Sequence, residues 1–254
     1  MGGLTVLRAL QQAMPGESFI YLGDTARLPY GSKSPATVER YALQAAEILV
    51  ARGIRALVVA CNTASAFALD ALAARHPELP VFGVLEPGAE AAAESASDSH
   101  VLVLATESTV NGGAYQRAIL SRRPDLKVHA RACPLLVALA EEGEHQGEFC
   151  QRVLEHYLHG HMAGDSISRP ASVVLGCTHF PVFTPALEAL LPPGTRVVDS
   201  AATTAARVSA ALGRVAGDRV PELTLLATDG VQRFARVGGY FLGRRIDEVE
   251  LVDL

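Results

Sequence analysis

Two of the four cysteines stand where a parallel α/β fold concentrates its chemistry. The segment V-V-A-C-N-T-A-S-A puts Cys61 after an apolar run, with Asn62 and Thr63 opening the next expected helix. The segment S-V-V-L-G-C-T-H-F-P puts Cys177 at the same kind of junction, 116 positions later. In open parallel sheets, ligands bind at the carboxyl ends of the strands. Both thiols are therefore expected at a ligand site.

Two opposed thiols suit the inversion of a carbon stereocentre without a cofactor. A free thiol has a pKa of about 8.5, which a helix amino terminus or a cationic neighbour lowers. A thiolate on one face of a Cα can remove its proton, while a neutral thiol on the other face delivers a new one. His179 is the candidate acid–base helper of Cys177. Backbone N–H groups and hydroxyls would stabilise the carbanion at the substrate carboxylate.

The spacing of these residues leaves other chemistry open. A metal site built from Cys61, Cys177 and His179 is conceivable, although zinc usually takes three or four ligands at shorter spacings. A Cys–His hydrolase pair is a further alternative. It is disfavoured because His179 shares the turn of Cys177 and no orienting Asn or Asp is evident.

The remaining cysteines and a group of histidines have simpler interpretations. Cys133 and Cys150 are interpreted as small buried hydrophobic residues. His156, His159 and His161 resemble a ligand cluster but lie in a charged helix end, which favours a solvated face. With no C-x-x-C pair and no secretion signal, all four cysteines are expected to be reduced.

The elements that must position the thiols follow the pattern of a parallel α/β fold, in which short β-branched runs alternate with helical stretches. Strands are predicted at 18–23, 56–60, 80–85, 101–105, 127–132, 172–176, 195–199 and 222–228. Helices are predicted at 35–52, 63–76, 86–97, 110–122, 147–162, 182–191 and 200–213. The helix-like start of the chain directly follows Gly2-Gly3, a glycine pair that normally comes after a strand. Either the chain lacks its first strand, or the fold begins unusually.

Composition excludes several classes of protein. The chain has 254 residues, of which 49% are hydrophobic and 19% charged, and a net charge of −5, as in ordinary globular proteins. Lys and Arg (22) are outnumbered by Asp and Glu (27) and do not cluster, so no nucleic-acid partner is expected. No apolar run approaches the roughly 20 residues that span a bilayer. No membrane association and a cytoplasmic location are expected.

Six strings in the chain resemble the glutamate racemase family and come in that family's order. They are Y-L-G-D-T-A-R-L-P-Y-G-S-K-S (21–34), V-A-C-N-T-A-S-A (59–66), F-G-V-L-E-P-G (82–88), T-E-S-T-V-N-G-G-A-Y (106–115), A-C-P-L-L-V-A-L-A-E-E-G (132–143) and L-G-C-T-H-F-P (175–181). The resemblance implies two similar parallel-sheet α/β domains related by a pseudo-twofold axis, with the active site in the cleft between them. Residues 1–84 and 198–254 would form the first domain, and residues 85–197 the second.

The resemblance also implies a role for each matching residue. Cys61 would be the base for one enantiomer and Cys177 the base for the other, with His179 and Glu141 assisting Cys177, and Asp24 would help to shape the cleft. The implied substrate ligands are Pro29, Tyr30, Gly31, Asn62, Thr63, Thr106, Thr109 and Thr178. Neither a cofactor nor a metal is implied.

Two departures from the family pattern stand out. Ala105 replaces the usual glycine before Thr106, which adds one methyl group near the pocket. The family also carries a strand and an Asp-Ser-Gly turn before the stretch that matches Gly2-Gly3-Leu4-Thr5. The Asp of that turn assists the first cysteine and the Ser contacts the substrate. We expect the chain to lack this strand and turn, as after a start placed at an internal methionine.

The expected activity is the interconversion of L- and D-glutamate by two cysteine bases, which supplies D-glutamate for peptidoglycan. Glutamate is the expected small-molecule partner, and a homodimer is left open. A first alternative is a racemase of the same superfamily that acts on aspartate or a hydantoin. A second is an inactive relative with a binding or regulatory role.

Overall fold

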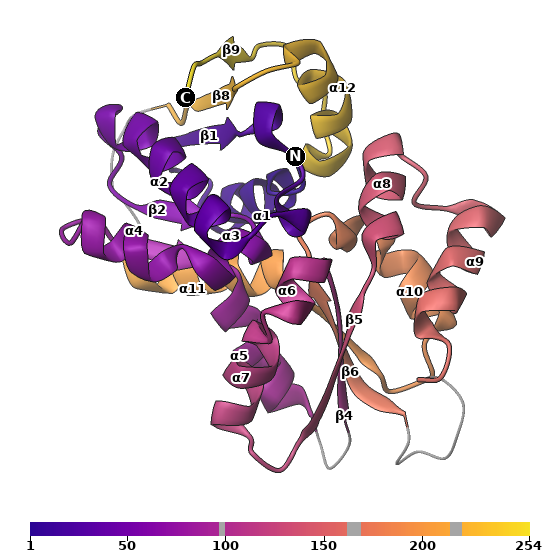
Figure 1. The fold of residues 1–254 in the computed structure, drawn as a ribbon. Helices are drawn as coiled ribbons and strands as arrows, with labels where there is room; N and C mark the ends of the chain where they lie inside the picture. Colours follow the sequence, from indigo (N-terminus) through magenta and orange to yellow (C-terminus); the bar gives the residue numbers. More distant parts are fainter. Residues whose placement is uncertain (97–99, 162–168, 214–219) are drawn as a thin grey trace.

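A computed structural model shows how the chain folds. It describes residues 1–96, 100–161, 169–213 and 220–254. Two lobes are visible, each built on parallel strands (Figure 1). We call the lobe that contains β1, β2, β3, β8 and β9 the first lobe, and the lobe that contains β4 to β7 the second.

The second lobe is a four-stranded parallel sheet between two layers of helices. Its strand order is β5-β4-β6-β7, formed by β4 (His100–Ala105), β5 (Lys127–Ala132), β6 (Pro170–Gly176) and β7 (Arg196–Asp199). Every residue of β4 is buried, and successive residues face opposite layers because side chains alternate along a strand. Leu102 and Leu104 pack towards α8 (Pro134–Glu142), α9 (Gly147–Leu158) and α10 (Thr184–Leu190). Val101 and Val103 pack towards α5 (Leu85–Ser95) and α7 (Ala114–Arg122).

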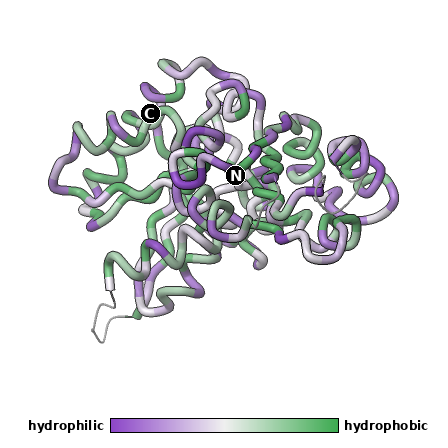
Figure 2. The backbone as a smooth tube through the Cα atoms, turned by 90° about the horizontal axis from the view of Figure 1, so that it is seen from below, coloured by the Kyte–Doolittle hydropathy of each residue, from purple (hydrophilic) through white to green (hydrophobic). Residues whose placement is uncertain are grey.

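The first lobe carries two smaller sheets. One has the order β1-β8-β9, from β1 (Phe19–Gly23), β8 (Leu223–Ala227) and β9 (Glu250–Leu251). The other pairs β2 (Leu57–Val59) with β3 (Val81–Gly83). Around them lie α1 (Leu4–Ala13), α2 (Pro35–Ala51), α3 (Asn62–Phe67), α4 (Leu69–Arg75), α11 (Ser200–Leu212) and α12 (Val231–Leu242). Hydrophilic and hydrophobic segments alternate along the chain, and several of the turns at the edge of the molecule are hydrophilic (Figure 2).

All eight predicted strands are present, and α2 ends beside Gly53, whose φ of 73° suits a glycine after a helix. Two predicted helices, 63–76 and 110–122, are each divided: the first into α3 and α4, the second into α6 (Glu107–Asn111) and α7. A 3-10 turn, η3 (Phe180–Phe183), precedes α10 within the predicted 182–191. The predicted ends at 97 and 162 fall outside the described residues. The helices α8 and α12 and the strand β9 were not predicted.

The carboxyl ends of the strands come together where the lobes meet. Cys61 follows β2, Asp24 follows β1, Thr106 follows β4 and Cys177 follows β6. The helix α1 adds a tie at this point, because its Thr5 hydroxyl donates to the carbonyl oxygen of Thr178 at 2.9 Å. No helix in the described ranges is long and apolar enough to cross a membrane.

Candidate active site

The thiol of Cys61 sits at the start of α3 and is partly exposed. Its sulfur accepts hydrogen bonds from the backbone N–H groups of Thr63 and Ala64 and from the Thr63 hydroxyl. Burial raises the pKa of this thiol, and the three hydrogen bonds oppose that rise because they stabilise the thiolate. The strand-end position predicted for Cys61 is confirmed.

The thiol of Cys177 is buried and has a different set of neighbours. Its sulfur lies 3.6 Å from Nδ1 of His179 and accepts the backbone N–H of the same residue. Nε2 of His179 lies 3.1 Å from Oε1 of Glu141, and Oε2 of Glu141 accepts a hydrogen bond of 2.9 Å from Arg233. The resemblance implied that His179 and Glu141 assist Cys177. In the structure the three side chains form one hydrogen-bonded line.

Charge along this line is set by burial and by the partners. Burial raises the pKa of Cys177 to about 12, and a thiolate at Cys61 adds to the rise. Burial alone would raise the pKa of Glu141, but the hydrogen bonds from His179 and Arg233 outweigh it and bring the pKa to about 2. Burial lowers the pKa of His179 against the opposing effect of Glu141. The line at neutral pH is therefore a thiol, a neutral imidazole and a carboxylate.

This protonation pattern gives His179 a defined direction. The carboxylate of Glu141 can only accept, so Nε2 of His179 carries the imidazole proton. Nδ1 is then an unprotonated acceptor that faces the Cys177 thiol. His179 is placed to take a proton from this thiol and to return it.

Three threonine hydroxyls meet beside Cys61. Thr63 lies 3.0 Å from Thr106 and 3.2 Å from Thr109, and these last two lie 3.0 Å apart, measured between Oγ1 atoms. We call this group the threonine triangle. Thr63 comes from the first lobe, whereas Thr106 directly precedes α6 and Thr109 lies within it, in the second lobe. The three residues predicted as substrate ligands are thus brought together across the lobes.

The side chain of Asn62 is held by one partner and has one free donor. Its Oδ1 accepts a hydrogen bond of 2.6 Å from the hydroxyl of Tyr115, which comes from α7. Its Nδ2 is buried and has no partner among the described residues. A buried N–H without a partner is costly, which is typical of a group that awaits a ligand.

The P-Y-G turn lies against α6. The backbone of Gly31 is so close to Thr106 that a Cβ would stand 2.7 Å from the threonine Cβ. Its carbonyl oxygen accepts a hydrogen bond of 2.7 Å from Ser108. The hydroxyl of Tyr30 donates to the carboxylate of Asp24, which also pairs with Arg27.

Pro29 is the first residue of this turn, and the peptide bond that joins it to Leu28 is cis. Thr178 lies beside Cys177 and is buried, and its carbonyl oxygen is tied to Thr5. All the predicted site residues therefore lie at the carboxyl ends of strands or in the turns and helices that follow them.

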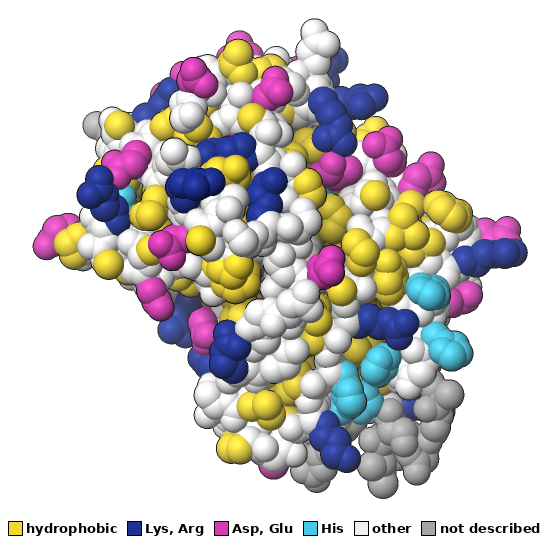
Figure 3. Space-filling view, in the orientation of Figure 1, with side chains coloured by type: hydrophobic (Ala, Val, Ile, Leu, Met, Phe, Trp, Pro, Cys, Tyr) yellow, Lys and Arg dark blue, Asp and Glu magenta, His cyan; other side chains and the backbone are white. Residues whose placement is uncertain are grey.

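The other cysteines and the histidines lie elsewhere. Cys133 and Cys150 are buried in the apolar core of the second lobe, as predicted. His156 and His159 are exposed on or after α9, in agreement with a solvated face. His161 differs, since its ring lies 5.6 Å from that of His129, and His100 adjoins both in the second lobe, where histidines gather in Figure 3. The described residues hold no group of His, Cys, Asp and Glu arranged to bind a metal.

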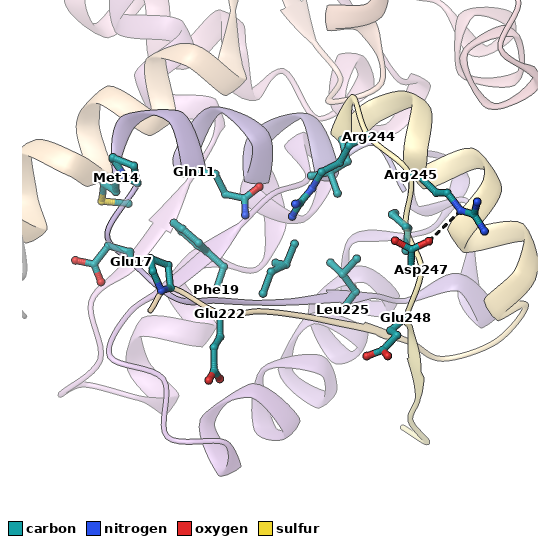
Figure 4. A pocket seen from close by; sticks show the side chains of 15 residues that line it. Gln11, Met14, Glu17, Phe19, Glu222, Leu225, Arg244, Arg245, Asp247 and Glu248 are labelled. Atoms are coloured by element: carbon teal, nitrogen blue, oxygen red, sulfur yellow. Dashed lines mark ion pairs between the residues drawn. The ribbon is translucent and has the colours of Figure 1, made fainter. Parts of the chain in front are cut away.

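A surface pocket of about 460 Å³ lies away from the thiols (Figure 4). It is bordered by Phe19 and Leu223, which begin β1 and β8, and by Arg245, which forms an ion pair of 2.9 Å with Asp247. The thiols follow the carboxyl ends of their strands, so this pocket is separate from the candidate site.

Two residues at the site were missed from the sequence. Tyr115 was part of a quoted motif, and a phenol in a motif that adjoins the cysteine turns could have signalled its role. Arg233 lies in α12, 92 positions from Glu141, and no local pattern connects the two.

Two parallel-sheet lobes that each present a thiol at a strand end define a two-lobed α/β protein with a pair of thiols at its candidate site. The family model for Asp/Glu/Hydantoin racemase matches residues 3–208. The chain belongs to this family. Among curated relatives, the glutamate racemase of Geobacter metallireducens is 43% identical over the whole chain and 94% of its own length. That of Koribacter versatilis is 40% identical with the same coverage.

Solved structures agree with this assignment. Glutamate racemase from Thermus thermophilus, in complex with β-chloro-D-alanine, is 41% identical with a TM-score of 0.86, covering 100% of this chain and 93% of its own. The Francisella tularensis enzyme, in complex with D-glutamate, is 31% identical with a TM-score of 0.89, covering 99% and 94%. An aspartate racemase from Picrophilus torridus, at 16% identity and a TM-score of 0.58, shares the fold alone. These matches give no support to the expectation that a first strand and an Asp-Ser-Gly turn are missing.

Proposed function

We propose that the protein interconverts L- and D-glutamate, with Cys61 and Cys177 as the two bases. The observation that carries this proposal is the unlike pair of thiols, one partly exposed and hydrogen-bonded at α3, the other buried and joined to His179 and Glu141. The full-length similarity to glutamate racemases supports glutamate as the substrate.

In one direction, the thiolate of Cys61 removes the Cα proton of the substrate and becomes a thiol. The electron pair left on Cα is delocalised into the substrate carboxylate. The thiol of Cys177 then gives its proton to the opposite face of Cα and becomes a thiolate. Exchange with solvent then returns a proton to Cys177 and removes one from Cys61, which restores the starting state. For the reverse direction, Nδ1 of neutral His179 takes the proton of the Cys177 thiol, and the imidazolium that forms is stabilised by the carboxylate of Glu141. In the other direction the two thiols exchange roles.

Polar groups beside the thiols are suited to hold the substrate carboxylates. The free Nδ2 of Asn62 offers one N–H, and the threonine triangle offers hydroxyls on the Cys61 side. The P-Y-G turn and Thr178 complete the proposed set of ligands. Hydrogen bonds that shorten as charge develops stabilise the carbanion more than the bound substrate, which is what accelerates the reaction.

The biological setting is also a proposal. D-Glutamate made by this reaction would supply peptidoglycan synthesis, which places the enzyme in the cytoplasm. We propose a division into one domain of residues 1–84 and 198–254 and another of residues 85–197. A homodimer is part of the same proposal.

The test is inversion of L-glutamate followed by circular dichroism, with L-aspartate as the competing substrate. We expect loss of the glutamate signal, with Cα deuterium incorporated from D₂O. Cys61→Ser and Cys177→Ser should each reduce kcat by roughly 10²–10⁴-fold, since each removes an acid–base group. The matched control is Cys150→Ala, a buried cysteine on α9 outside the site, which should retain activity. Inversion of aspartate alone, or no effect of either serine variant, would overturn the proposal.

A further inference from the structure

The line that starts at Cys177 ends in the other lobe. Cys177, His179 and Glu141 all belong to the second lobe, whereas Arg233 lies on α12 of the first. Figure 1 shows α12 beside the upper end of α8, which carries Glu141. The carboxylate uses one oxygen for His179 at 3.1 Å and the other for Arg233 at 2.9 Å. Glu141 is therefore oriented from both lobes at once.

We propose that Arg233 is a positioning residue for the Cys177 half of the reaction. It fixes the rotamer and the ionised state of Glu141, and through Glu141 the tautomer of His179. This inference rests on the proposed function, because it assigns Arg233 to the base pair that the function requires.

The exposure of the partners indicates what Arg233 contributes. Its side chain is 47% exposed, whereas that of Glu141 is 16% exposed. An ion pair with one partner in solvent adds little to global stability, typically about 0–1 kcal/mol. The ion pair with Arg233 instead selects one orientation of the Glu141 side chain, which has several rotatable bonds. Loss of Arg233 is thus expected to leave folding nearly intact and to weaken the acid–base function of His179.

The helix α12 supports the same imidazole a second time. The ring of Phe241 packs edge-on against His179, with centroids 5.2 Å apart and an angle of 87°. Tyr240 adds a contact to the turn after α8, since a Cβ on Gly143 would meet its ring at 3.3 Å. One helix of the first lobe therefore holds both the imidazole and its carboxylate partner, so the relative position of the lobes controls the proton path of Cys177.

The experiment compares Arg233→Ala with Arg236→Ala, a matched arginine on the exposed side of the same helix that has no partner among the described residues. We expect Arg233→Ala to lower kcat about tenfold, a fraction of the roughly 10²–10⁴-fold that an acid–base group supplies. The acidic limb of its pH profile should move to higher pH, because Arg233 lowers the pKa of Glu141. Arg233→Lys should recover part of the loss, and Arg236→Ala should behave as wild type.

Substrate deuterated at Cα provides a readout that a purely structural role would not move. When the Cys177 step is slowed, the isotope effect should rise for the enantiomer that Cys177 deprotonates and fall for the other. In a double-mutant cycle, Arg233→Ala should cost nothing further on a Glu141→Gln background. Unchanged isotope effects, or an equal loss on both backgrounds, would overturn the role of Arg233. Absence of glutamate inversion in the wild type would instead refute the proposed function.

Discussion

Gly2 lies directly against the ring of His179. A Cβ at Gly2 would stand 2.5 Å from Nδ1, the imidazole atom that faces Cys177. The ring is held on another side by Phe241, at a centroid distance of 5.2 Å. The imidazole therefore has little room to turn, and its direction towards the thiol is fixed by packing as well as by Glu141.

Replacing Gly2 by alanine should displace this ring. The methyl group cannot be accommodated without movement of His179, and such overpacking typically costs about 1–3 kcal/mol. We expect kcat for glutamate inversion to fall about tenfold or more. Gly16→Ala is the control, because a Cβ there meets nothing within 4 Å. Equal activity of the two variants would show that the imidazole position does not limit the reaction.

Acid should destabilise the fold partly through Glu141. Folding lowers the pKa of this carboxyl from 4.5 to about 2. A carboxyl of this kind contributes stability above its unfolded pKa, and this contribution is lost as pH falls towards the folded pKa. Between about pH 6 and pH 3, the free energy of unfolding of wild type should fall by about 1–2 kcal/mol more than that of Glu141→Gln, with allowance for solvent screening. Parallel urea-unfolding curves of the two proteins at every pH would contradict this.

The hydroxyl of Thr63 should tune the Cys61 thiol. It donates to the sulfur, and so lowers the pKa that burial raises. In Thr63→Val the pKa of Cys61 is expected to rise. This pKa is measured from the pH dependence of alkylation by iodoacetamide. The substrate enantiomers serve as protecting ligands, so that alkylation of the site thiols is recognised by its suppression. Thr203→Val, on α11 outside the site, is the control. If the alkylation profiles of the two variants coincide, the hydroxyl does not stabilise the thiolate.

Tyr115 should matter for binding more than for proton transfer. Tyr115→Phe leaves Oδ1 of Asn62 without its donor, and a buried acceptor without a partner costs about 1–3 kcal/mol. The amide can then reorient and withdraw Nδ2 from the substrate. We expect KM to rise several-fold with a smaller change in kcat, whereas Tyr240→Phe, at an exposed position, should change neither. A fall in kcat alone would indicate a different role for Tyr115.

The sequence predicted the strands well because the runs that form β4 and β6 are nearly continuous in apolar residues, as buried parallel strands require. The positions of both thiols at strand ends were predicted correctly because each thiol follows an apolar run of this kind. The helix α12 was missed because Gly238 and Gly239 lower helix propensity in its interior, yet packing of its apolar face against α1 sustains it. The sequence does mark both ends of α8, with Pro134 at its first position and Gly143 after its last, so this helix could have been predicted.

Partners far apart in the chain could not be predicted. Nothing near Glu141 indicates an arginine 92 positions later, and the pairing depends on how the lobes meet. The division of 63–76 into α3 and α4 is likewise tertiary, since the helix breaks at Ala68, a fully buried residue of the type with the highest helix propensity.

The threonine triangle has a property that suits mirror-image substrates. Thr63 directs its one O–H proton at the sulfur of Cys61, so within the triangle its oxygen can only accept. Either Thr106 or Thr109 can donate to that oxygen while the other turns its O–H outward, and the exchange needs only rotation of O–H bonds. The same scaffold can therefore offer a donor from either of two oxygens to ligands of opposite hand without moving a heavy atom.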